Sequence, residues 1–131
     1  MQSRFLIAAA YGSMLASIFL TRVFRLFTVA DVLSVAAFVC AALLLRIRWS
    51  QLEAAEKTLV AGALVGLSGV LVKLVLAALG IPDVPAGADH TYPGLTGSDR
   101  LFMHIHHLFF NAGFLLYLIA ALLMLLRKFR A

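Results

Sequence analysis

Four long apolar blocks separated by polar connections dominate this chain of 131 residues. We expect helices over residues 5–26, 28–46, 57–79 and 99–127, because each block approaches the ~20 apolar residues that cross ~30 Å of hydrocarbon. Lipid offers no hydrogen-bond partner to the backbone, so a spanning block should be helical. The sequence therefore predicts an all-α membrane protein: one integral domain over residues 1–131, a bundle of four transmembrane helices running up-down-up-down.

Composition supports this class of protein. Hydrophobic residues make up 63% of the chain and charged residues only 13%, whereas soluble domains are roughly half apolar and about a quarter charged. The net charge of +5 does not indicate nucleic acid as a partner, because in a membrane protein the distribution of Lys and Arg among loops is what matters. The single cysteine, Cys40, excludes an intrachain disulfide.

The basic residues predict an orientation. With four spans, both termini share a side with the second connection, and that side carries seven basic residues: Arg4, Arg46, Arg48, Lys57, Arg127, Lys128 and Arg130. The opposite side carries three, namely Arg22, Arg25 and Arg100. By the positive-inside rule both termini are cytoplasmic, and we expect a bacterial inner (plasma) membrane. The outer loop, residues 81–98, holds all three prolines and no Lys or Arg.

Three polar residues are predicted to lie at one depth near the outer leaflet. The helix rise places Asp31, Lys73 and Asn111 about 22–24 Å from the cytoplasmic basic residues. An unpaired lysine inside a membrane costs about 3 kcal/mol, so we expect an Asp31–Lys73 ion pair with Asn111 as a further hydrogen-bond partner. Such a group either locks helix packing or lines a ligand pocket together with His107, and Lys73 could instead snorkel to the interface.

A glycine stripe marks a predicted packing face on the third helix. Gly62, Gly66, Gly69 and Lys73 fall at i, i+4, i+7 and i+11, on one side of a helix. Small residues let membrane helices approach closely. The stripe is therefore expected to pack inside the bundle or against a neighbouring chain.

The segment RLFMHIHHLFFNAGF places three histidines in the fourth block. His104, His107 and Asn111 are spaced i, i+3 and i+7, so they share one helix face. The face that carries His106 is different, and its other members are aromatic or small: Phe110, Gly113 and Tyr117.

Several chemistries remain open for these histidines. A transition-metal site would combine His104 and His107 with His90 or with an acidic residue, Asp89 or Asp99. A haem would need one axial histidine, a loop ligand or a partner chain, and proton or anion handling would use the histidine pKa. Histidines beside aromatic residues at a membrane interface also serve as simple anchors.

The sequence leaves the function open between two classes. The first hypothesis is a non-enzymatic accessory or assembly subunit of a larger membrane complex or homo-oligomer. The second is a membrane protein that binds a metal, haem or small ligand near the outer leaflet, and a small dimeric transporter is a weaker third. The rim arginines, Arg22, Arg25 and Arg100, could hold an acidic lipid headgroup or a quinone carbonyl, or simply mark the interface. No phosphate-binding loop or catalytic triad is present. The expected partners are the lipid bilayer and other membrane subunits or further copies of this chain.

Overall fold

The computed structural model describes residues 2–24, 27–47, 49–81 and 97–130, and every regular element in these ranges is helical. The elements in chain order are α1 (Gln2–Phe19), the π-helical turn η1 (Leu20–Phe24), α2 (Phe27–Ala42), the 3-10 turns η2 (Leu43–Arg46) and η3 (Trp49–Gln51), α3 (Ala54–Ala78) and α4 (Gly97–Arg130). The expected all-helical class is confirmed.

Three helical segments are long and apolar enough to cross a membrane: Ser3–Phe24, Ala54–Ala78 and Gly97–Arg130. The helices therefore indicate an integral membrane protein. The second apolar block differs from its expected range of 28–46, because its α-helical part, Phe27–Ala42, has only 16 residues and continues as the tighter η2 turn.

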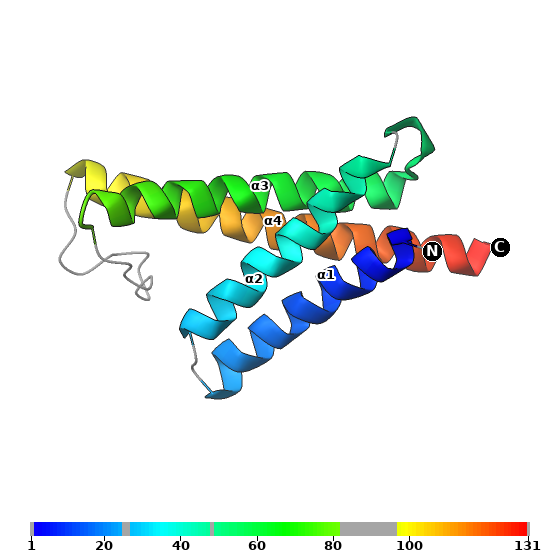
Figure 1. Ribbon diagram of the computed structural model, residues 1–131, viewed down its shortest axis with the longest axis horizontal. Coiled ribbons are helices and arrows are strands. Elements are labelled where there is room, and N and C mark those ends of the chain that lie inside the picture. The colour runs from blue at the N-terminus through cyan, green and yellow to red at the C-terminus, as the bar shows by residue number, and fades with distance from the viewer. Residues whose placement is uncertain (1, 25–26, 48, 82–96, 131) are drawn as a thin grey trace.

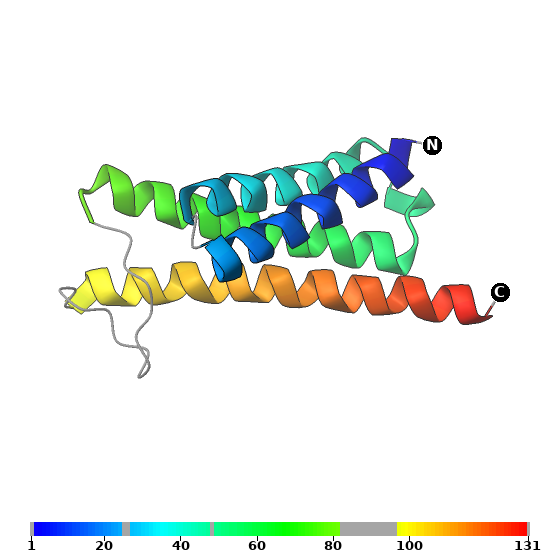
Figure 2. The same ribbon diagram turned by 90° about the horizontal axis from the view of Figure 1, so that it is seen from below.

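The helices form two hairpins. α3 and α4 lie side by side along most of their length, and α1 lies beside α2 (Figures 1 and 2). The hairpins meet chiefly where α2 packs on α3, near the end of the molecule that carries both termini (Figure 1). Toward the η1 end the α1–α2 hairpin diverges from α3 and α4 (Figure 1), so the two hairpins leave a wedge between them.

Glycines set the short distance between α3 and α4. A Cβ built on Gly113 would lie 3.0 Å from the Gly62 carbonyl oxygen and 3.1 Å from Gly66 Cα. The whole stripe of Gly62, Gly66 and Gly69 is buried, against α4 and against Phe38 of α2. The stripe is therefore occupied within this chain and is not available to a neighbouring chain.

Aromatic rings fill the place where α2, α3 and α4 meet. Phe38 is fully buried, and its ring contacts those of Phe110, Phe114 and Tyr117 edge-on at centroid distances of 5.6, 6.0 and 5.6 Å. The Tyr117 hydroxyl donates to the Ala37 carbonyl oxygen at 2.7 Å. A buried phenol needs such a partner, and this bond fixes α4 to α2.

Charged residues define the start of α3. The Glu56 carboxylate accepts a hydrogen bond from the Glu53 backbone N–H at 3.0 Å, in a capping box that begins α3 at Ala54, three residues before the expected start at 57. Glu53 also forms an ion pair with Arg127 of α4. This contact ties the first turn of α3 to the last part of α4.

Candidate functional site

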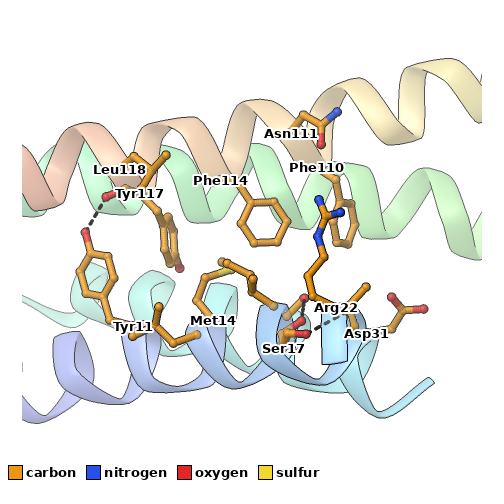
Figure 3. Close-up of a pocket in the computed structure, with 14 residues that line it drawn as sticks. Tyr11, Met14, Ser17, Arg22, Asp31, Phe110, Asn111, Phe114, Tyr117 and Leu118 are labelled. Atoms are coloured by element: carbon orange, nitrogen blue, oxygen red, sulfur yellow. Dashed lines mark hydrogen bonds between the residues drawn. The ribbon is translucent and has the colours of Figure 1, made fainter. Parts of the chain in front are cut away.

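The wedge between the hairpins contains a cavity of about 460 Å³. Its lining comes from α1, η1, α2 and α4, with no residue of α3 (Figure 3). The lining residues are Tyr11, Met14, Leu15, Ser17, Ile18, Thr21, Arg22, Asp31, Ser34, Phe110, Asn111, Phe114, Tyr117 and Leu118. Its walls are apolar and aromatic over most of their length. The polar side chains of the α1–α2 hairpin gather near η1. The cavity is thus amphipathic along its length.

Tyrosines close the apolar end of the cavity. Tyr11 of α1 donates its hydroxyl hydrogen to the Tyr117 carbonyl oxygen of α4 at 2.7 Å (Figure 3), and their rings meet edge-on at a centroid distance of 5.6 Å. This contact joins the two hairpins at one end of the cavity. Toward η1 the hairpins diverge, so α1 and α4 move apart there (Figure 1).

A short hydroxyl network builds the polar end. Ser17 of α1 and Ser34 of α2 are buried, and their Oγ atoms lie 2.6 Å apart. Thr21 Oγ1 donates to the Ser17 carbonyl oxygen at 2.9 Å, a type of side-chain bond that bends helices. At this point α1 gives way to the π-helical η1 turn, a geometry that recurs at functional sites.

The η1 turn aims Arg22 across the wedge. Arg22 is exposed and lines the cavity, and its guanidinium points from η1 toward α4 (Figure 3). Asn111, also exposed, lies on the α4 side of the same cavity (Figure 3). Two polar groups capable of donating hydrogen bonds therefore border the cavity from different helices.

The expected Asp31–Lys73 ion pair is present. Lys73 Nζ of α3 lies 2.5 Å from Asp31 Oδ2 of α2, and the two side chains are 28% and 48% exposed. Asp31 lines the cavity, but Lys73 does not. Lys73 therefore contacts the Asp31 carboxylate from outside the cavity lining, and its positive charge offsets the negative charge of Asp31.

The four residues expected to form one pocket do not all meet. Asp31 and Asn111 share the cavity, whereas Lys73 and His107 are not part of its lining. His107 is partly buried, and its ring lies 5.0 Å from that of His106. The cavity instead includes Arg22 and Thr21, which the expected pocket lacked.

The histidine cluster divides between two environments. His106 is only 5% exposed, and its Nδ1 lies 2.8 Å from the Gly69 carbonyl oxygen of α3, while its ring packs edge-on against Phe110. His104 is exposed and borders a shallow depression with Arg100. The face that carries His106, rather than the face of His104, is therefore the one buried against α3.

The metal and haem hypotheses stay predictions. Within residues 2–24, 27–47, 49–81 and 97–130, no group of three or more His, Cys, Asp or Glu side chains could hold a metal ion. His90 and Asp89, which were expected to complete such a site with His104 and His107, lie outside the described residues. The histidines that the structure does describe all come from α4.

We predict that His106→Leu lowers the free energy of unfolding by about 1–3 kcal/mol, because it removes the hydrogen bond to Gly69 and changes a tightly packed contact. The control is His104→Leu on the exposed face, which we expect to change stability by less than about 0.5 kcal/mol. Thermal unfolding in a mild detergent, followed by circular dichroism, measures both. Equal effects of the two substitutions would contradict the inward placement of His106.

No protein-family model, curated protein or solved structure matches this chain. The site is therefore interpreted from its own residues and geometry.

Proposed function

We propose that this chain is a four-span integral membrane protein, with both termini cytoplasmic, that binds a small amphiphilic ligand in the wedge cavity and does not transform it. Binding between the hairpins is the role that the amphipathic lining supports best. The proposal has two parts, the membrane topology and the ligand.

The length of the second apolar block supports a fourth span. The 16 residues of α2 give about 24 Å at the α-helical rise, and the 4 residues of η2 add about 8 Å at the 3-10 rise. The sum, about 32 Å, matches the ~30 Å hydrocarbon core. The termini and the η2–η3 connection lie at one end of the molecule (Figure 1), which supports cytoplasmic placement of that basic end.

The cavity is the single observation that carries the ligand proposal. Ligand sites are typically concave, about 300–1,000 Å³, mostly apolar, and supplied with a few convergent polar groups. The wedge cavity, at about 460 Å³, has this size, and its lining is mostly apolar with a few polar groups. Charged and amide groups such as Arg22 and Asn111 are costly beside hydrocarbon, so an occupant with a polar head stabilises this part of the protein.

The accessory-subunit hypothesis stays a prediction. One contact that it could have used, the glycine stripe of α3, is buried against α4 and Phe38. The apolar side chains that remain exposed, such as Leu71 and Leu125, are those that any membrane protein presents to lipid. We rank ligand binding first because the cavity supports it, and the weaker transporter hypothesis has no observation of its own.

A cavity-filling substitution tests the proposal. Leu118 lines the cavity and is 64% exposed, whereas Leu122, one helical turn further along α4, is 59% exposed and is not part of the lining. Leu118→Trp should lower retention of a bound amphiphile at least about tenfold, equivalent to 1.4 kcal/mol. Leu122→Trp should leave it unchanged.

Native mass spectrometry of the untagged full chain, released from mild detergent, measures that retention as the fraction of protein carrying an amphiphile adduct. Both substitutions replace an exposed leucine on α4, so both variants should fold. Equal adduct fractions in the two variants would overturn the cavity as the binding site.

A further inference from the structure

We propose that the polar end of the wedge cavity is a binding site for the anionic, phosphate-bearing headgroup of a lipid, with Arg22 as its charge anchor. This inference rests on the proposed amphiphile-binding function and names the chemistry of the ligand. Three features of the described residues carry it: the charge balance, the donors, and the lateral opening of the cavity.

The charge balance of the polar end favours an anion. Arg22 and Asp31 are the charged residues among those that line the cavity. The Asp31 carboxylate is already paired with Lys73 at 2.5 Å, so that pair is neutral as a unit. Among Arg22, Asp31 and Lys73, the described charged residues that line the cavity or pair with its lining, one net positive charge therefore remains on Arg22, and an anionic headgroup compensates it.

The donors suit a phosphate in particular. A guanidinium presents N–H groups in a planar fork that binds two phosphate oxygens at once. The Asn111 amide, on the α4 side of the cavity, supplies further N–H donors. The Thr21 hydroxyl hydrogen is committed to the Ser17 carbonyl oxygen, so Thr21 can only accept, for example from a hydroxyl of the headgroup.

The lateral opening favours a lipid over a free anion. Exposed apolar side chains border the cavity on both hairpins, with Leu15 and Ile18 of α1 at 66% and 44% exposure and Leu118 of α4 at 64%. The rings of Phe110 and Phe114 also line the cavity (Figure 3). An acyl chain can therefore lie along these walls, while the phosphate reaches Arg22.

The direction of Arg22 distinguishes this site from an ordinary interfacial arginine. A snorkelling arginine extends away from the hydrocarbon toward water. Here the side chain extends across the wedge toward α4 (Figure 3) from the π-helical η1 turn, which changes the helical phase at this residue. Its guanidinium thus borders the cavity with Asn111.

The test is a headgroup comparison on the full chain in lipid-free detergent, with binding measured by native mass spectrometry during titration. The probes are phosphatidylglycerol, the zwitterionic phosphatidylcholine, uncharged diacylglycerol with the same acyl chains, and inorganic phosphate. We expect phosphatidylglycerol to bind about tenfold or more tightly than diacylglycerol, with inorganic phosphate bound far more weakly than either.

Variants assign this preference to Arg22. Arg22→Gln should reduce phosphatidylglycerol affinity about tenfold and leave diacylglycerol binding unchanged, whereas Arg22→Lys should restore part of the preference. Arg100→Gln is the matched control, because Arg100 is also exposed but does not line this cavity. Circular dichroism verifies that each variant is folded.

Each alternative outcome is distinct. Equal binding of phosphatidylglycerol, phosphatidylcholine and diacylglycerol, or an unchanged preference in Arg22→Gln, overturns the headgroup site while leaving the amphiphile cavity intact. Binding of none of the three lipids overturns the proposed function itself. Inorganic phosphate that binds as tightly as phosphatidylglycerol assigns the site to a free anion and overturns the lipid.

Discussion

Gly66→Leu is expected to lower the free energy of unfolding by about 3 kcal/mol or more, at or beyond the upper end of the usual cost of overpacking. Even the first side-chain atom of the new residue would collide with the ring of Phe38, which is fully buried among other rings. On the α4 side Gly113 is also close, because a Cβ built on Gly113 would approach Gly66 Cα to 3.1 Å. Neither neighbour can move without separating α3 from α4 or α2.

A graded series gives this prediction its control. Gly66→Ala should lower the free energy of unfolding by about 1–3 kcal/mol, which is a smaller loss than that expected for Gly66→Leu. Gly12→Ala on α1 meets nothing within 4 Å and should be neutral or stabilising by up to about 1 kcal/mol, because alanine favours a helix. Detergent-dependent unfolding followed by near-ultraviolet circular dichroism measures all three variants. A stability of Gly66→Leu close to that of the unsubstituted protein would mean that the α2–α3–α4 core is misplaced.

Lys73→Met should produce the second large effect, a loss of about 2–3 kcal/mol. The substitution keeps most of the length of the side chain but leaves the Asp31 carboxylate without the ammonium that lies 2.5 Å away. Removing one partner of a low-dielectric ion pair costs more than the pair contributes, because the other charge stays behind uncompensated. A single charge within a membrane carries a cost of similar size.

A double-mutant cycle separates this effect from loss of packing. Asp31→Asn alone should also destabilise the protein, because Lys73 then loses the carboxylate that lies 2.5 Å from its Nζ. The double variant Asp31→Asn with Lys73→Met carries no charge at either position, so it should recover most of the stability, with a coupling energy of about 1–3 kcal/mol. Additive losses in the double variant would show that the two side chains act independently.

The number and position of the helices follow from the sequence because lipid imposes a single physical requirement. Apolar blocks long enough to span must be helical, and each of the four expected blocks overlaps one of the α-helices. Helix ends are less predictable. The capping box at Glu53 and Glu56 extends α3 to Ala54, and α4 runs to Arg130, because backbone capping and polar terminal residues extend a helix beyond its apolar block.

The inward face of α4 was harder to predict, because apolar residues lie all round this helix and periodicity alone does not show which side is buried. Spacing correctly separated the face of His104 and His107 from the face of His106. The useful signal was residue size: Gly113 and Ala120 share the face of His106, and small residues mark close helix contacts in membranes. Both are buried, on the same side as the Nδ1 of His106 that contacts Gly69.

The cavity itself could not be derived from the sequence. Equal depth along three helices suggested that Asp31 and Lys73 meet, because an isolated charge in a membrane needs a partner. Depth says nothing, however, about the angle between two hairpins. That angle opens the wedge and places Arg22 and Asn111 in the lining of the same cavity. The η1 turn that directs Arg22 depends on local hydrogen bonding, and no apolar pattern encodes it.

The most direct measurement of the central claim is photocrosslinking with a lipid that carries a photoreactive group on its acyl chain. The wedge cavity predicts that labelled peptides concentrate on the α1 and α4 walls, around Met14 and Phe114, and that excess unlabelled phosphatidylglycerol displaces the label there. The exposed faces that carry Leu71 and Leu125 should be labelled weakly and without competition. Uniform labelling of all exposed apolar faces, unaffected by competitor, would contradict a lipid-binding site between the hairpins.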